Sequence, residues 1–265
     1  MEQNLSKKTR TESDLIGSRE VPESALYGVQ TLRGIENFRI SKFHLNEYPL
    51  FIQALAITKM GAAVANRELD LLTEEQADAI LKACKEILEG KHHDQFPVDM
   101  IQGGAGTTTN MNANEVIANR ALELMGHQRG EYQYCSPNDH VNRSQSTNDA
   151  YPTAIHIGLY YTHLKLVKHF EVLIESFRKK ATEFAHVIKM GRTQLEDAVP
   201  MTLGQTFNGF ASILRHEVKN LDFAAQDFLT VNMGATAIGT GITAEPEYAE
   251  KCIAALRKIT GLDIK

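Results

Sequence analysis

Three short stretches of the chain are rich in glycine, hydroxyl and amide residues, and each precedes a segment with helical character. They read GGAGTTTN at residues 103–110, SQSTND at residues 144–149 and GRTQ at residues 191–194. The first turn of a helix has free backbone N–H groups and a positive dipole end, and Ser or Thr hydroxyls add further donors. Such stretches favour a carboxylate or a phosphate as ligand.

Helix capping is a second explanation of the same residues. Thr, Ser, Asn and Asp are the preferred N-cap residues, and glycine permits the tight turns that precede a helix. A cap needs one such residue, however, whereas each stretch holds several and three stretches occur in one chain. We therefore predict anion binding and keep capping as the alternative.

Signatures of other chemistries are missing from the sequence. It contains no GxxxxGK[ST] phosphate-binding run, no GxSxG nucleophile motif and no HExxH or paired Cys/His spacing, so we expect no metal site. Its three cysteines, Cys84, Cys135 and Cys252, are odd in number and widely spaced. This pattern suits reduced thiols rather than a disulfide framework.

Composition narrows the classes of partner. The 265 residues carry a formal net charge of −5 without a basic stripe, which argues against a nucleic-acid partner. The N-terminal segment lacks the apolar core of a signal peptide, and no run of about 18 apolar residues could span a bilayer. We therefore expect a cytoplasmic protein with no membrane contact.

Several helices are expected from periodicity and from start and stop signals. An apolar, proline-initiated run predicts a helix over residues 49–68, and Thr73 with Gln76 forms a capping box for a second helix that stops at Gly90. Helices are also predicted over residues 112–127 and around residues 248–259. Residues 1–48 show no clear periodicity, apart from a turn at residues 21–24.

Two much longer helices are predicted over residues 151–188 and 202–231, where apolar residues recur at threes and fours. A polar connection, residues 191–200, would join them into an antiparallel pair whose aromatic stripes pack as core. The expected fold class is all-α. A mixed N-terminal helical domain (residues 1–143) precedes part of a long central helical bundle (residues 144–265), which is incomplete at its C-terminal side.

Three blocks carry a family resemblance that runs from about Val21 to the last residue. The blocks GGAGTTTNMNANEVIANRALELMG, SPNDHVNRSQSTNDAYPTA and KMGRTQLEDAVPMTLGQ resemble, in order and spacing, those of the aspartase/fumarase superfamily. Ala105, Ser136 and Gln194 stand where fumarases usually carry serine, histidine and histidine. These residues favour the aspartase branch, the aspartate ammonia-lyases.

The resemblance implies elimination of ammonia from L-aspartate to give fumarate, through an aci-carboxylate intermediate and without a cofactor. It implies that Thr107, Ser146 and Thr147 hold the β-carboxylate of the substrate. By the same likeness, Asn148 and Gln194 lie near the substrate amino group, and Thr193 contacts the α-carboxylate.

The resemblance also implies what this sequence lacks. Family members carry a mobile loop with a Gly-Ser-Ser pattern followed by Met-Pro-x-Lys-x-Asn, whose serine is the catalytic base, and we expect that loop beyond Lys265. The family forms homotetramers whose active sites draw the three polar stretches from different subunits. The 265-residue chain alone is therefore expected to be inactive. A fumarase-like hydratase and a catalytically inactive anion-binding protein remain the alternatives.

Overall fold

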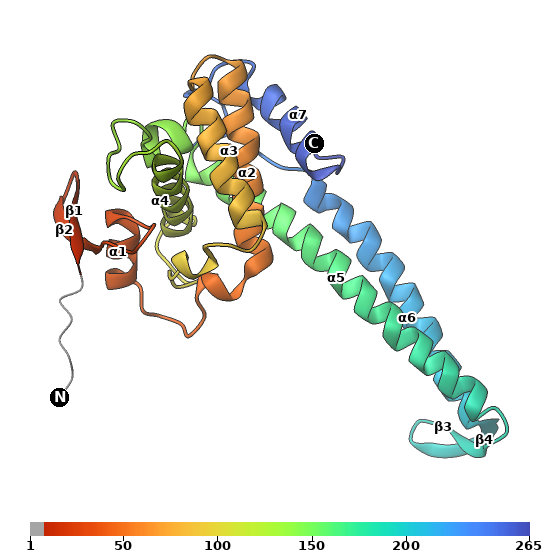
Figure 1. Cartoon of the computed structure of the whole chain (residues 1–265). Helices are drawn as coiled ribbons and strands as arrows, with labels where there is room; N and C mark the ends of the chain where they lie inside the picture. Colours follow the sequence, from red (N-terminus) through yellow and green to blue (C-terminus); the bar gives the residue numbers. More distant parts are fainter. Residues whose placement is uncertain (1–7) are drawn as a thin grey trace, which may run out of the picture. The chain divides into compact units, whose positions relative to one another are not determined.

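The computed structural model describes residues 8–265 and is predominantly helical, which confirms the predicted fold class (Figure 1). The chain forms two compact units. The first unit comprises residues 8–158 together with residues 229–265, and the second unit comprises residues 159–228.

The first unit begins with a β-hairpin that the sequence analysis did not predict. Strands β1 (Thr9–Asp14) and β2 (Gly17–Pro22) pair antiparallel, with Asp14 opposite Gly17 at the turn. Most of their side chains are exposed, so the strands lack the alternation of apolar and polar residues that marks a half-buried strand. Helix α1 (Val29–Asn37) follows the hairpin.

The predicted helices α2 (Pro49–Glu68) and α3 (Glu74–Leu88) are confirmed. Pro49 occupies the first turn of α2, and the Thr73 hydroxyl accepts a hydrogen bond from the Gln76 N–H in the capping box of α3. Gly90 follows α3 with a φ of +87°, the left-handed conformation that ends many helices. Helix α2 packs against α3.

Helix α4 (Thr107–Leu124) begins earlier than the predicted Asn112, so the first polar stretch runs directly into it. Its buried face is unusually polar, because Asn110, Asn112, Asn114, Glu115 and Asn119 are all buried. Both carboxylate oxygens of Glu115 accept backbone N–H groups at the start of α1. This polar helix therefore fixes neighbouring backbone segments.

The remaining elements of the first unit are short. They are the 3₁₀ turns η1 (Leu45–Glu47) and η2 (His93–Gln95), the single π-helical turn η3 (Pro137–Val141) and helix α7 (Tyr248–Thr260). Helix α7 confirms the predicted short helix and packs against α2. The two helices approach closely at Gly61, where an added Cβ would lie 2.6 Å from a methyl group of Leu256.

Helix α5 (Thr147–Glu183) confirms one long helix but corrects both of its ends. It begins at Thr147 rather than at Tyr151, and Ile188, the predicted last residue, already belongs to a strand. Pro152 lies near the helix start. It is beyond the first turn, inside the helix, so it removes one backbone hydrogen bond and leaves the Asn148 carbonyl without its helical donor.

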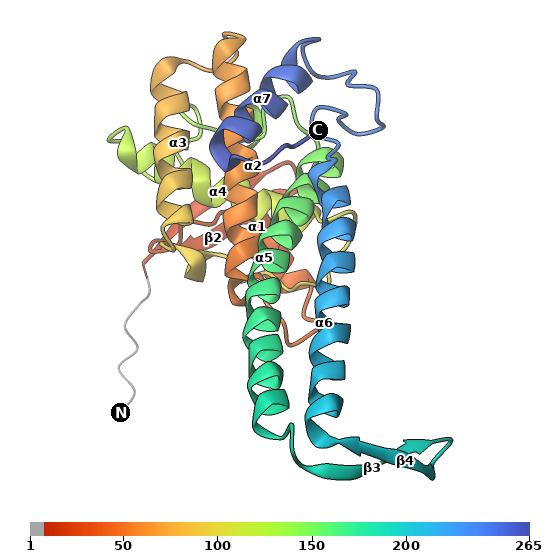
Figure 2. The same cartoon turned by 90° about the vertical axis from the view of Figure 1, so that its right-hand side faces the viewer.

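The second unit contains the rest of α5, a β-hairpin and helix α6 (Leu203–Ala225), which ends in the 3₁₀ turn η4 (Gln226–Leu229). Helices α5 and α6 lie side by side and antiparallel (Figures 1 and 2). The connection predicted as a polar loop is instead the antiparallel pair β3 (Ile188–Thr193) and β4 (Glu196–Thr202). Thr202, the predicted first helical residue, is the last strand residue and the N-cap of α6.

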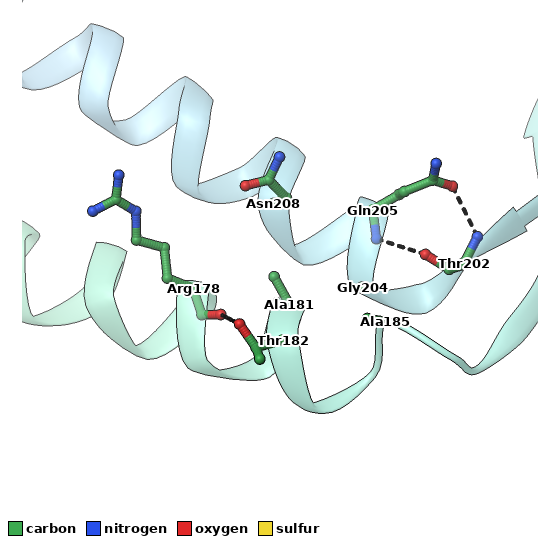
Figure 3. Close-up of a pocket in the computed structure, with 8 residues that line it drawn as sticks. All are labelled: Arg178, Ala181, Thr182, Ala185, Thr202, Gly204, Gln205 and Asn208. Atoms are coloured by element: carbon green, nitrogen blue, oxygen red, sulfur yellow. Dashed lines mark hydrogen bonds between the residues drawn. The ribbon is translucent and has the colours of Figure 1, made fainter.

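Aromatic side chains pack between the two long helices, as predicted. The Phe177 ring lies 6.0 Å from that of Phe207 and 5.6 Å from that of Phe210, and Phe184 lies 5.8 Å from Phe207. Near the hairpin the backbones approach closely at Gly204, where an added Cβ would lie 2.4 Å from the Ala181 carbonyl oxygen. A cavity of 720 Å³ opens beside this contact, and its lining includes none of the predicted site residues (Figure 3).

Within residues 8–265, none of the helices combines the length and the apolar composition that a membrane span requires.

Candidate active site

The N-termini of α4 and α5 lie next to each other in the first unit. The Asn110 amide nitrogen donates to the Thr147 hydroxyl oxygen over 3.3 Å. The Tyr151 ring packs against Gly106, the N-cap of α4, where an added Cβ would lie 2.4 Å from ring carbons. Two of the predicted anion-binding stretches therefore meet, and each presents the positive end of a helix dipole.

Ser146 and Thr147 both use their hydroxyl oxygens as acceptors inside the protein. The Ser146 Oγ accepts the Asn148 N–H over 2.9 Å, and the Thr147 Oγ1 accepts the Asn110 amide. Capping is thus part of what Ser146 does. Each bond uses an oxygen lone pair, however, and leaves the hydroxyl hydrogen able to donate to a ligand. Thr107, the first residue of α4, has an exposed side chain.

The glycine-rich segment of residues 232–241, to which the sequence analysis assigned no role, is bound to the start of α5. The Asn148 amide nitrogen donates to the Ala237 carbonyl over 2.8 Å. The Asn148 carbonyl in turn accepts the Asn232 amide over 3.0 Å. This carbonyl lacks its helical donor because Pro152 has no N–H, so the Asn232 side chain replaces the missing backbone bond.

Asp149 completes this attachment. One carboxylate oxygen accepts the Ser146 N–H over 2.9 Å, and the other accepts the N–H groups of Gly234 and Thr236 at 3.0 and 3.1 Å. The side chain is fully buried, and these three backbone N–H groups occupy both of its oxygens. Asp149 therefore holds the start of α5 and the glycine-rich segment in one arrangement.

Lys59 is a buried residue of this site that the sequence analysis missed. Its Nζ donates to the side-chain oxygens of Asn110 in α4 and of Asn142 and Gln145 in the segment before α5, at 2.8, 2.9 and 2.8 Å. Burial lowers the pKa of the Lys59 ammonium to about 7. The only signal in the sequence is that Lys59 is the one charged residue in an apolar run of α2.

Thr193 and Gln194 lie in the second unit. Thr193 ends β3 opposite Glu196, and Gln194 and Leu195 form the two-residue turn with φ values of +50° and +69°. Positive φ at both positions is the pattern of a type I′ hairpin turn. The prediction that this stretch directly precedes a helix is wrong, because β4 separates it from α6. The structure thus assembles four of the predicted site residues in one unit and two in the other.

Nothing in the described part of the chain resembles a metal centre, since residues 8–265 hold no cluster of three His, Cys, Asp or Glu side chains arranged to bind an ion. The three cysteines are free and buried, and burial raises the pKa of each thiol to about 12. The polar groups at the site are hydroxyls, amides, helix N-termini and one buried ammonium. That set favours a carboxylate ligand.

Comparison with known proteins gives a consistent result. A family model described as lyase matches residues 17–265. The chain is 54% identical over 258 residues to the aspartate ammonia-lyase of Escherichia coli K12, covering 97% of this chain and 54% of that protein. It is 56% identical over 253 residues to the Pseudomonas fluorescens aspartate ammonia-lyase, covering 95% and 53%.

Solved structures agree with the sequence relatives. A fumarate lyase:delta crystallin from Brucella melitensis superposes with a TM-score of 0.95 at 51% identity, covering 97% of this chain and 56% of that one. A class II fumarase from Schistosoma mansoni superposes with a TM-score of 0.89 at 36% identity, covering 96% and 53%. The chain spans about half the length of the curated relatives it matches.

Proposed function

The chain belongs to the lyase family, and from that premise we propose that the whole protein is an aspartate ammonia-lyase, which converts L-aspartate into fumarate and ammonia. Relatives with that name are 54% and 56% identical to the chain, whereas the similar fumarase structure is 36% identical. The observation that carries the proposal is the meeting of two helix N-termini, with donor hydroxyls, beside a buried ammonium.

In the proposed reaction a base removes the proton from C3 of aspartate, next to the β-carboxylate. The electron pair of the broken C–H bond moves onto that carboxylate, which becomes an aci-carboxylate dianion. The C2–N bond then breaks, a double bond forms between C2 and C3, and ammonia leaves. We propose that Thr107, Ser146 and Thr147 donate to the β-carboxylate, because donors aimed at developing charge stabilise the transition state more than the substrate.

The remaining predicted site residues are assigned to the other groups of the substrate. Asn148 uses its amide nitrogen toward Ala237, so we assign its side-chain oxygen to the substrate ammonium group. Thr193 is assigned to the α-carboxylate and Gln194 to the vicinity of the amino group. The catalytic base is assigned to a serine in the part of the whole protein that this chain does not cover. None of these steps requires a cofactor.

We propose that the whole protein is a cytoplasmic homotetramer whose active sites combine residues of different subunits. The resemblance of the three polar stretches to those of the family supports this, because family members draw these stretches from different subunits. Analytical ultracentrifugation of the active protein is expected to give a tetramer. An active monomer would contradict the shared site.

The reaction is tested by incubating the purified whole protein with L-aspartate and measuring fumarate by ultraviolet absorbance. We expect fumarate and ammonia in equal amounts, and aspartate from the reverse reaction. In a second assay the protein is incubated with fumarate in the absence of ammonia, and malate is measured. Malate formation there, with no ammonia released from aspartate, would instead identify a hydratase, and substrate binding without turnover would support an inactive anion-binding protein.

A further inference from the structure

Lys59 makes three hydrogen bonds that use all the donors of its ammonium group. Its Nζ donates to Asn110, Asn142 and Gln145, and each acceptor is a neutral amide oxygen. The side chain is 1% exposed, so it has exchanged the water around its charge for these three oxygens. A buried charge is costly unless it is fully hydrogen-bonded. The three hydrogen bonds therefore offset the cost of burying the charge, and such a costly group is expected to have a function in the site.

The ammonium determines which way the Asn110 amide faces. An ammonium has no acceptor, so Asn110 must present its oxygen to Lys59. Its nitrogen then faces the other way, toward the Thr147 Oγ1 at 3.3 Å and the Asn142 Oδ1 at 3.1 Å. Because the Thr147 oxygen accepts from Asn110, its hydroxyl hydrogen is left to point elsewhere. Lys59 thereby sets the direction in which Thr147 donates.

The other two acceptors attach the ammonium to the loop before α5. Gln145 presents its oxygen to Lys59 and donates from its nitrogen to the carbonyls of Val141 and Arg143 at 3.0 and 3.1 Å. Asn142 accepts from Lys59 and donates to the Gln145 carbonyl over 3.2 Å. One cation thus holds the loop that carries Ser146 and Thr147.

Charge complements this geometry. The contacts of Lys59 are neutral, and the buried carboxylate of Asp149 acts on it through space while accepting backbone N–H groups. The ammonium therefore has no ionic partner in direct contact, and the Asp149 carboxylate at the start of α5 offsets part of its charge through space.

Resting on the proposed function, we propose that Lys59 is a positioning residue: through Asn110 it orients the Thr147 hydroxyl as a donor to the substrate carboxylate. Lys59 itself does not contact the substrate in this scheme. It acts through a directed relay in which the ammonium donates to an amide oxygen, the amide nitrogen donates to a hydroxyl oxygen, and the hydroxyl donates to the ligand.

The sharpest test is Asn110→Asp in the whole protein. The change is nearly isosteric and gives Lys59 an ionic partner, but it removes the nitrogen that donates to Thr147. The Thr147 hydroxyl would then donate to the introduced carboxylate rather than to substrate. We expect kcat/KM for aspartate to fall about tenfold or more, with the loss of the donor at Thr147 as its cause. The melting temperature is expected to change little, since the new ion pair offsets the lost bond to Asn142.

A double-mutant cycle separates the relay from a general loss of structure. If Asn110 acts through Thr147, Asn110→Asp should reduce kcat/KM far less in a Thr147→Ala background than in the wild type. Lys59→Met is expected to lower kcat/KM to a similar degree, whereas Lys82→Met, at an exposed lysine of α3, leaves it unchanged. The Asn110→Asp variant carries the test even where Lys59→Met fails to fold.

The outcomes are distinguishable. Wild-type protein that forms no fumarate would overturn the proposed function and the inference that rests on it. Active wild-type protein whose Asn110→Asp variant keeps its kcat/KM would overturn the relay alone. The relay would also be overturned if Asn110→Asp lowered kcat/KM equally in the wild type and in the Thr147→Ala background, because the effect of Asn110 would then not depend on the Thr147 hydroxyl.

Discussion

Ser146 and Thr147 each accept a hydrogen bond within the protein, so each can serve both the helix and a ligand. The capping and anion-binding interpretations of these residues are therefore compatible, because a hydroxyl has lone pairs and a hydrogen. What distinguishes the two interpretations is which property changes when the hydroxyl is removed.

We predict that Ser146→Ala and Thr147→Ala each lower the elimination rate of the whole protein about 10²–10³-fold, the cost of losing one donor to developing negative charge. Ser146→Ala should also lose roughly 1 kcal/mol of stability as a helix cap. Thr73→Ala is the control, since the Thr73 hydroxyl caps α3 by accepting the Gln76 N–H and lies outside the predicted site. It should lose stability without loss of rate. Rates within a few-fold of wild type, with stability reduced, would leave capping as the only role of Ser146.

At the level of single residues, hydroxyls and amides just before a helical segment predict anion binding without knowledge of the fold, and this remains a prediction. Lys59 was missed because a single lysine in an apolar helix is ordinarily expected to reach solvent. Its burial depends on Asn142 and Gln145, which lie more than 80 residues away in sequence.

The starts of helices α4 and α5 approach closely because Gly106 has no side chain. Gly106 has a φ of +86°, and Tyr151 fills the space where its Cβ would be. The left-handed conformation and the ring contact both require glycine here. This contact sets the spacing of two site segments.

Gly106→Ala is therefore predicted to lower both the thermal stability and the activity of the whole protein. Gly126→Ala separates the two causes, because Gly126 has a φ of +82° but no atom within 4 Å of the added Cβ. It should show only the backbone cost, about 1–2 kcal/mol. Differential scanning calorimetry of both variants is the measurement. Equal shifts in melting temperature would show that the Tyr151 contact is not tight.

Helices α3 and α4 are joined by an ion pair with two hydrogen bonds. Arg120 donates from Nε and Nη2 to Glu86 over 2.6 and 2.8 Å. The hydrogen bonds from Arg120 lower the pKa of Glu86 to about 2, against its ordinary value of 4.5. A carboxyl group with a lowered pKa stabilises the folded state above its unfolded pKa, and this contribution is lost as pH falls toward the folded value.

Glu86→Gln should accordingly destabilise the protein at pH 7, and the difference from wild type should shrink as pH falls from 4.5 toward 2. Urea unfolding at a series of pH values measures this. Glu89→Gln is the control, because Glu89 pairs with Lys91 at the exposed surface, where ion pairs contribute little. A difference between wild type and Glu86→Gln that is constant with pH would contradict the assigned cause.

At the level of elements, prediction was accurate for helices with local signals and poor for strands. The capping box at Thr73 and the proline start of α2 depend on residues within one helical turn. The strands β3 and β4 were missed because their residues are mostly exposed, and exposed strands show no alternation. The proposed division into domains at residues 143 and 144 remains a prediction.

The whole molecule is expected to need more than these 265 residues for catalysis. Large apolar side chains on α5 and α6 are exposed, including Val172 at 68%, Ile213 at 60% and Phe223 at 83%. Surface of this kind on two long helices is typical of bundles completed by other helices. The missing catalytic base is proposed to lie outside the chain as well.

The 265-residue chain by itself is predicted to form no fumarate from aspartate and to associate or aggregate. Purified chain is assayed alone and after mixing with a separately produced polypeptide that supplies the rest of the family sequence. Activity that appears only on mixing is the expected result. Robust activity of the chain alone would overturn the assignment of the base to the remaining part of the protein.

The sequence by itself determined the all-α fold class, the helices with local start and stop signals and the family, and it predicted the anion-binding stretches. These depend on residues within a few positions of each other, or on motifs that can be read directly. Only the tertiary structure decided that the starts of α4 and α5 meet, that Asp149 binds Gly234, and that Lys59 donates to Asn110. Hydrogen bonds between residues 51 to 87 positions apart depend on the path of the whole chain, and no local pattern encodes that path.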